Sequence, residues 1–293
     1  MQSPKDLREA LTAQGLSVRA AARRLNYDHA YLSRVLSGKQ VPSPHLVAAL
    51  EELCGVPLIE PTPESMAESL ASLRRAEDVQ GAERVRAPVL SQARLVVKLA
   101  EDAHGPGRKA MVDLAGQWAN FAGWIELENR RRGQARKWFD RASEYAAEAD
   151  DPSLASHVLS FKGYMAGRLG NVWASEGLTG AAWRIKGVHP AQDTYNNFQY
   201  ARVLALMGDV MRAGRLLDQA VGGIDLATLD EPLPYAYWYS RPFFVMNAGL
   251  THATLGHVSM ATDLISDGLA DMPEDQQKAE WIDEFLAAMP DGH

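Results

Sequence analysis

The sequence predicts an all-α protein in which a small N-terminal helical bundle precedes a solenoid of helical hairpins. Apolar residues recur at i, i+3 and i+4 along the chain, whereas the alternation typical of strands never persists. The charge balance differs between the first fifth of the chain and the rest, and a glycine-centred pattern recurs in the second half. A chain of 293 residues is long enough for one small and one larger domain, each with its own core.

Basic residues outnumber acidic residues only near the N-terminus. Residues 1–55 hold seven Lys and Arg against five Asp and Glu, while residues 56–293 hold 23 against 32, so the net charge of −7 comes from the second part. Between Ser17 and Pro42, five basic residues accompany a single acid, Asp28. A basic segment in an acidic chain suggests a polyanionic partner such as nucleic acid, although such residues also form ordinary solvated surfaces.

Capping and breaking residues divide the N-terminal segment into four short helices, which we expect near residues 3–15, 17–25, 29–36 and 42–53. Ser17 and Asp28 are the expected N-caps of the second and third helices, and Gly38 closes the third. Pro57, Pro61 and Pro63 then interrupt helix formation. We therefore predict a bundle domain over residues 1–56, a linker containing a helix over 57–87, and a repeat domain over 88–293.

The repeat domain is marked by a pattern that follows Gly170, Gly208 and Gly256, each of which ends one helix and begins another. A small residue follows each glycine after five positions and another after twelve, with a larger residue between them. The three sets are Ser175, Thr179 and Ala182; Ala213, Leu217 and Ala220; and Ala261, Ile265 and Gly268. An earlier copy lacks the glycine and keeps Ala135, Phe139 and Ala142.

This pattern resembles tetratricopeptide repeats, which are helix–turn–helix units of about 34 residues. The spacings between the glycines are 38 and 48 residues, and the Trp, Leu and Tyr typical of the first helix are mostly missing. The resemblance covers about residues 110–275 and implies degenerate repeats that stack into a curved solenoid with a concave face.

Residues 17–43, SVRAAARRLNYDHAYLSRVLSGKQVPS, resemble the helix-turn-helix of the Xre/lambda-repressor-like family, and the resemblance extends over about residues 3–56. Ala22 supplies the small residue needed where the two helices cross, and Leu32 and Val35 supply apolar contacts from the second helix. Asn26 takes the turn position usually held by glycine, a departure that Asn tolerates because it adopts left-handed backbone conformations more readily than most residues.

The resemblance implies that the second helix of the motif enters the major groove of double-stranded DNA. It places four residues near base edges, namely His29, Ala30, Ser33 and Arg34, of which Arg34 suits bidentate contact with guanine. It places four others near phosphates, namely Arg19, Arg23, Tyr31 and Lys39.

Other roles remain open for several of these residues. Arg23 and Arg34 are also compatible with a solvated or ion-paired surface, although the motif around them favours DNA contact. Tyr27 and Tyr31 are also compatible with a packing pair, and the turn position of Tyr27 favours the core. No set of Cys or acidic partners stands near His29 at metal-ligand spacing.

The repeat domain carries aromatic residues suited to ligand capture: Trp118, Trp124, Trp173 and Trp183, together with the segments 194–200 and 234–244. The candidate effector-binding residues are Asn196, Asn197, Tyr200, Tyr239, Arg241 and Asn247, and Arg202 is a further candidate for binding a carboxylate. Aromatic residues at helical spacing also form the core between repeats, so both interpretations stay open.

Several classes of protein lack support in the sequence. No apolar run approaches the roughly 18 residues that span a bilayer, and one cysteine, Cys54, permits no intrachain disulfide. A phosphate-binding glycine loop, a nucleophile elbow and an HExxH motif are all missing. We therefore expect a cytoplasmic protein that is not an enzyme and needs no cofactor or metal.

The combination of an Xre-type domain with a tetratricopeptide-like solenoid resembles two groups of bacterial regulators. One group comprises peptide-sensing quorum regulators, and the other comprises actinobacterial regulators, which the Ala- and Arg-rich composition favours. The resemblance implies a sequence-specific transcriptional regulator that binds DNA as a homodimer and senses a peptide, small molecule or protein partner. The alternative is an interaction adaptor whose helix-turn-helix is degenerate and no longer binds DNA.

Overall fold

The computed structural model describes residues 11–12, 15–40, 43, 46, 49–50, 53, 62–229, 232–233 and 235–290. The chain forms two compact units, Met1–Ser65 and Met66–His293. The described residues contain helices and no strand, which confirms the all-α prediction for this part of the chain. None of the described helices is long and apolar enough to cross a bilayer. The start of the predicted first helix and most of the predicted fourth lie outside the described residues.

The first unit contains α2 (Val18–Arg24) and α3 (His29–Val35), with the caps that the sequence predicts. The Ser17 hydroxyl accepts a hydrogen bond from the Ala20 amide, and the Asp28 carboxylate accepts one from the Tyr31 amide. Asn26 has a φ of +56°, so it makes the left-handed turn in place of glycine. The buried apolar core is Leu11, Ala21, Ala22, Leu32, Val35, Leu36, Leu46 and Leu50.

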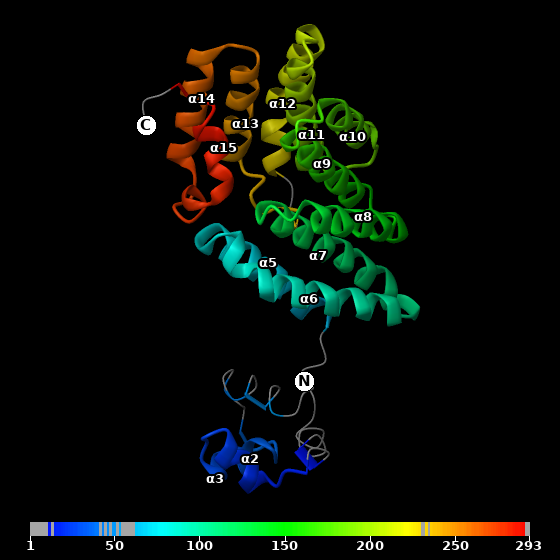
Figure 1. The fold of residues 1–293 in the computed structure, drawn as a ribbon, viewed down its shortest axis with the longest axis vertical. Helices are drawn as coiled ribbons and strands as arrows, with labels where there is room; N and C mark the ends of the chain where they lie inside the picture. The colour runs from blue at the N-terminus through cyan, green and yellow to red at the C-terminus, as the bar shows by residue number, and fades with distance from the viewer. Residues whose placement is uncertain are drawn as a thin grey trace. The chain divides into compact units, whose positions relative to one another are not determined.

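The second unit begins with two long helices and continues as four helical hairpins, which follow one another in chain order in Figure 1. The first two helices are α5 (Pro63–Gln80) and α6 (Ala82–Asp102). After the short η1 (Gly105–Gly107), the hairpins are α7 (Arg108–Glu128) with α8 (Arg132–Ala149), α9 (Pro152–Arg168) with α10 (Val172–Arg184), α11 (Pro190–Leu206) with α12 (Val210–Leu229), and α13 (Arg241–Thr254) with α14 (Val258–Asp271). The described chain ends in η2 (Gln276–Lys278), η3 (Glu280–Ile282) and α15 (Asp283–Leu286).

The hairpin turns explain the repeating sequence pattern. Gly170, Gly208 and Gly256 have φ values of +77°, +84° and +83°, so each occupies the left-handed position that closes the first helix of its hairpin. In the α7–α8 hairpin, Arg130 stands at the equivalent position and adopts a φ of +59°. The small and larger residues that follow these turns are all buried, which confirms that they form the contact between the two helices of each hairpin.

From α6 to α11, alternate helices of the solenoid contact each other through residues 40 positions apart. Ion pairs join Glu101 on α6 to Arg141 on α8, and Glu128 on α7 to Arg168 on α9. The Asn196 amide on α11 donates a hydrogen bond to the Ser156 hydroxyl on α9. Because each pair spans 40 residues, the first three hairpins stack with a nearly constant period. The last hairpin departs from it, since α11 begins at Pro190 and α13 at Arg241.

The segment 57–87, expected as a linker with one helix, contributes helices to the second unit. Met66 and Leu70 on α5 are buried together with Val85 and Val89 on α6. These residues belong to one apolar cluster that also contains much of α7. The segment packs because an apolar stripe that includes Met66 and Leu70 runs along one side of α5.

We predict that Gly268→Ala destabilises the second unit by about 1–3 kcal/mol because its methyl group has no space. A Cβ at this position would lie 2.4 Å from Met246 Cγ and 2.8 Å from the Pro242 carbonyl oxygen, and the backbone oxygen cannot rotate away. All seven tryptophans lie after residue 65, so urea unfolding of the full chain, followed by tryptophan fluorescence, reports on the second unit alone.

Gly214→Ala is the matched control because no atom lies within 4 Å of the position that the new methyl group would take. Replacing a helical glycine by alanine without a clash is expected to leave the unit unchanged or to stabilise it by up to about 1 kcal/mol. Equal midpoints for Gly268→Ala and Gly214→Ala would show that the close approach of α13 and α14 contributes nothing.

Candidate DNA-binding surface and ligand pocket

The predicted base-reading residues lie on α3. His29, Ala30 and Arg34 are exposed, and Ser33 is half-buried. The Arg34 Nε donates a hydrogen bond to Gln40 Oε1 at 2.9 Å, which uses one of its five N–H donors. The structure thus places these side chains on the solvent-facing side of the helix, while Leu32 and Val35 point into the core.

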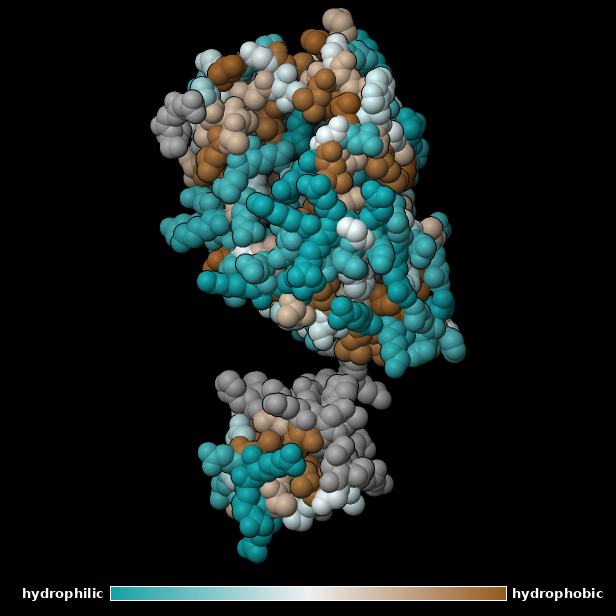
Figure 2. Space-filling view, viewed as in Figure 1, coloured by the Kyte–Doolittle hydropathy of each residue, from teal (hydrophilic) through white to brown (hydrophobic). Residues whose placement is uncertain are grey.

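The predicted phosphate-contacting residues fall into two groups. Arg19 and Arg23 on α2 and Lys39 after α3 are exposed, and hydrophilic side chains cover part of this unit in Figure 2. Tyr31 is half-buried, its hydroxyl accepts a hydrogen bond from the Ser43 amide at 3.1 Å, and its ring stacks on Tyr27 with centroids 6.0 Å apart. These contacts favour a packing role for Tyr31, whose contact with phosphate stays a prediction.

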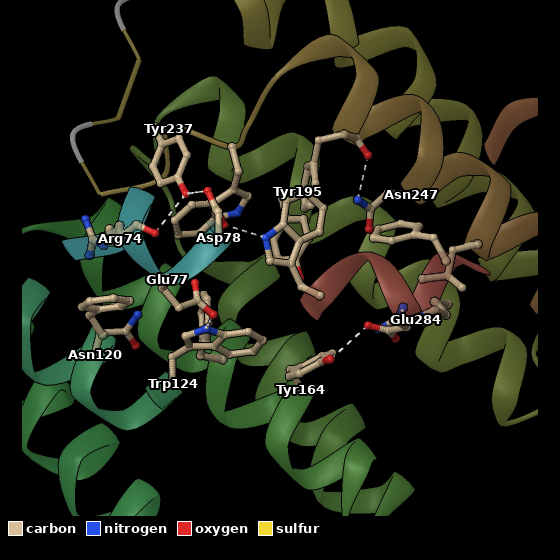
Figure 3. A pocket seen from close by; sticks show the side chains of 18 residues that line it. Arg74, Glu77, Asp78, Asn120, Trp124, Tyr164, Tyr195, Tyr237, Asn247 and Glu284 are labelled. Atoms are coloured by element: carbon tan, nitrogen blue, oxygen red, sulfur yellow. Dashed lines mark hydrogen bonds and ion pairs between the residues drawn. The ribbon is translucent and has the colours of Figure 1, made fainter. Parts of the chain in front are cut away.

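The second unit contains a pocket with about 830 Å³ of space not filled by atoms, including its open mouth. Ten of its lining side chains are aromatic: Phe121, Trp124, Phe161, Tyr164, Tyr195, Tyr237, Trp238, Phe243, Trp281 and Phe285. They come from α7, α9, α11, α13, the segment before α13 and the C-terminal elements, and Figure 3 shows several of them around the cavity. Apolar walls with a few polar groups are the common composition of ligand sites.

Three carboxyl groups line the pocket, and aromatic side chains hold each of them. The Asp78 carboxylate accepts hydrogen bonds from the Tyr237 hydroxyl and, at 3.0 Å, from the Trp281 Nε1. The Glu77 Oε1 accepts one from the Trp124 Nε1 at 3.2 Å. These bonds fix the two carboxyl groups in the wall of the pocket (Figure 3).

The third carboxyl group, Glu284, is the one with an ion-pair partner in the pocket. Its Oε2 accepts a hydrogen bond from the Tyr164 hydroxyl at 3.0 Å, and its Oε1 lies 2.9 Å from Arg202 Nη1. Arg202 therefore does bind a carboxylate, as its sequence position suggested, but the carboxylate belongs to the chain itself.

Burial shifts the ionisation of the groups on α5. Desolvation, with a smaller contribution from the neighbouring charge of Asp78, raises the pKa of Glu77 to about 8. Desolvation also raises the pKa of Asp78, against the effect of its two hydrogen-bond donors. Glu77 is therefore protonated in much of the population near pH 7, because removing a carboxylate from water disfavours its charged form.

Two buried polar side chains in the pocket wall have atoms without a hydrogen-bond partner. They are Arg74, at Nε and Nη1, and Asn120, at Oδ1, and each residue is 2% exposed. The Arg74 guanidinium lies 5.4 Å from the centroid of the Phe121 ring, and burial lowers its pKa to about 9. In Figure 3 this guanidinium points away from Asp78 and Glu284.

Of the six predicted effector-binding residues, only Asn247 lines this pocket. Asn196 and Tyr239 instead belong to a buried network in which both contact Gln192, at 2.9 and 3.1 Å. His157, fully buried, contacts the same glutamine at 2.8 Å, and burial lowers its pKa to about 3. This network joins α9, α11 and the segment before α13.

The other three predicted residues contact the protein itself. Asn197 accepts a hydrogen bond from the Trp183 Nε1 at 2.9 Å, and the Tyr200 hydroxyl donates one to Glu176 at 2.8 Å. Arg241 is exposed and forms an ion pair with Asp225. Effector binding by these residues stays a prediction.

The charged residues of α5 were missed because a run of charges usually marks a solvated surface. A signal was present, since Met66, Leu70, Arg74, Glu77 and Asp78 follow helical spacing and form one continuous stripe. The buried positions of this helix are these same five residues. On α5, charged side chains that continue the helical spacing of the apolar residues are buried with them and form a polar site.

Comparisons with known proteins bear on the first unit. Residues 5–61 match the family model described as a helix-turn-helix domain. No curated protein matches the chain. A solved structure of PlcR from Bacillus thuringiensis, in complex with the peptide PapR7 and DNA, is similar with 10% identity and a TM-score of 0.37, over 97% of this chain and 95% of that chain. The family match, together with the caps and turn of α2 and α3, identifies residues 5–61 as a helix-turn-helix domain.

Proposed function

We propose that the protein is a sequence-specific DNA-binding transcriptional regulator whose helical-repeat domain senses an effector. The observation that carries the proposal is the helix-turn-helix domain, whose α3 exposes His29, Ala30 and Arg34. Arg19, Arg23 and Lys39 are exposed in the same unit, as phosphate contacts require. The effector is a small molecule or peptide in the pocket of the repeat domain.

The competing function is an interaction adaptor with a helix-turn-helix that no longer binds DNA. The exposed basic residues favour the regulator, because a packing module has no need of three exposed cationic side chains on α2 and after α3. Fluorescence anisotropy with duplexes selected from a random pool separates the two functions. The regulator binds selected sequences far more tightly than scrambled ones, whereas the adaptor binds all duplexes equally and weakly.

Two variants are expected to affect DNA binding in different ways. Arg34→Ala removes a base contact and weakens binding to the selected duplex by about 1–3 kcal/mol, with loss of preference at one base position. Lys39→Ala removes a phosphate contact, weakens binding to every duplex similarly, and reduces the slope of log K against log salt by about 1. Anisotropy titrations at about 50 and about 200 mM salt measure the affinity of each variant and the slope of its salt dependence.

Arg136→Ala is the matched control, because Arg136 is exposed on α8 in the other unit and loses the same charge. It is expected to leave DNA affinity unchanged. If Arg34→Ala and Lys39→Ala behave like Arg136→Ala on a duplex that the protein selects, α3 is not the reading helix.

The proposal includes a homodimer, since helix-turn-helix proteins commonly bind two half-sites with two subunits. Eleven large apolar side chains are exposed among the described residues, and six of them lie within four positions of the three hairpin glycines. These are Trp173, Leu206, Val210, Met211, Val258 and Met260. Turns of stacked hairpins lie along one edge of a solenoid, so this apolar edge suits contact with a second copy.

Met211→Glu is expected to convert the dimer to a monomer because it places a charge in that edge. Its side chain is exposed, so the substitution leaves the fold intact. Leu229→Glu, at the far end of the same helix and also exposed, is the control and keeps the dimer. Sedimentation velocity at micromolar concentration measures both, and a monomeric parent protein would contradict the proposal directly.

A further inference from the structure

Carboxyl groups outnumber guanidinium groups in the pocket of the second unit. Its wall contains three carboxyl groups, Glu77, Asp78 and Glu284, against two guanidinium groups, Arg74 and Arg202. Arg202 pairs with Glu284. Among the described residues, neither Glu77 nor Asp78 forms an ion pair, although they are only 5% and 3% exposed.

Arg74 does not satisfy these two carboxyl groups despite lying on the same helix. Its guanidinium lies over the Phe121 ring, and its Nε and Nη1 have no hydrogen-bond partner. Figure 3 shows it directed away from Asp78. The charge of Arg74 is therefore held on one side of α5, and the carboxyl groups of Glu77 and Asp78 face the aromatic part of the pocket.

The aromatic walls favour the same kind of ligand as the carboxyl groups. The indole N–H of Trp124 donates to Glu77 and that of Trp281 donates to Asp78, so each indole lies directly beside a carboxyl group. Among aromatic rings, indole binds cations most strongly. An aromatic face attracts a cation through its quadrupole, most strongly where water is excluded. The buried Asn120 Oδ1, which has no partner, adds an acceptor to the same wall.

We infer that this pocket binds an organic cation, an ammonium group on an apolar or aromatic body, with the charge at Glu77 and Asp78 and the body among the aromatic rings. The inference rests on the proposed function, of which it specifies the effector class. An anionic ligand, which Arg74 would select, is excluded by this inference. A neutral apolar ligand is expected to bind more weakly because it lacks the positive charge.

Three probes that share a phenethyl body and differ in the charge of the head group test the inference on the full-length protein. They are phenethyltrimethylammonium, neutral phenethyl alcohol and anionic 3-phenylpropanoate, each titrated by calorimetry and by fluorescence of the pocket tryptophans. The cation is expected to bind at least tenfold more tightly than the other two. Tighter binding of the anion, equal binding of all three, or binding of none would overturn the inference.

Glu77→Gln is the decisive variant, because glutamine can still accept the hydrogen bond from Trp124 while losing the charge. It is expected to weaken binding of the cation about tenfold or more and to leave phenethyl alcohol unchanged. Glu68→Gln, an exposed position on the same helix, is the control and changes neither. Tryptophan fluorescence of the free variants verifies that the unit stays folded. Equal binding by the two variants would overturn the assignment to Glu77.

The pH dependence gives an independent measurement. The cation selects ionised Glu77, whose pKa is about 8 in the empty pocket, so its affinity falls by roughly tenfold per unit as pH drops from 8 to 6. The permanently charged probe does not itself titrate, and Glu77→Gln is expected to remove the slope. The charged and polar groups that face Glu77 are Arg74 and Asp78 on α5, Trp124 and Glu128 on α7, Tyr237, and Glu280 on η3.

DNA binding is measured separately, so the two proposals fail in different ways. If the cation binds through Glu77 and leaves DNA affinity unchanged, the ligand class stands and effector sensing fails. If DNA binds with sequence preference but the probes do not discriminate by charge, the regulator stands and the ligand class fails.

Discussion

The arrangement of the second unit depends most on the two hydrogen bonds that the buried carboxylate of Asp78 accepts. The donors are Tyr237 and Trp281, residues 159 and 203 positions away in the chain. Solenoid repeats otherwise contact mainly their neighbours, so few interactions oblige the first helix and the last elements to meet. Glu280 adds a second connection, since its Oε2 accepts a hydrogen bond from the Ala82 amide at 3.2 Å. The pocket exists because these contacts hold α5 against the C-terminal elements.

The same hydrogen bonds reduce the energetic cost of burying Glu77 and Asp78 in the pocket wall. Burying a carboxyl group raises its pKa and destabilises the fold unless donors compensate. The chain supplies neutral donors, the indole and phenol groups of Trp124, Trp281 and Tyr237, in place of full ion pairs. Neutral donors orient Glu77 and Asp78 without adding a positive charge that would compete with a cationic ligand. That arrangement contributes little to stability compared with an apolar wall, and it leaves the carboxyl groups available to a ligand.

The helical hairpins could be predicted from the sequence because their determinants, left-handed glycines followed by small residues, act within one hairpin. The role of the central polar residues could not be predicted. Asn196 is of a residue type common in ligand sites, but its side-chain amide forms hydrogen bonds with Gln192 and Ser156 of the chain itself. The pocket lay beyond sequence reasoning because its walls come from distant segments, and nothing local connects Trp281 with Asp78. Periodicity assigns a residue to the face of a helix but does not say which helix covers that face. Only the tertiary contacts separate the residues that line the cavity from those that fill the core.

Helix α5 joins the pocket to the part of the chain that leads from the helix-turn-helix domain. Its start is fixed by reciprocal hydrogen bonds between Thr62 and Ser65, at 3.1 and 3.2 Å, so the helix is capped from its first turn. Glu77 lies about 22 Å farther along the same helix, at a rise of 1.5 Å per residue. A ligand bound at Glu77 therefore contacts the one lining helix that continues directly into the linker. Coupling between two sites is reciprocal, so DNA must change the affinity of the cation by the same factor by which the cation changes the affinity of DNA. A factor different from one would show that the two sites are coupled, whereas independent affinities would mean that the two units act separately.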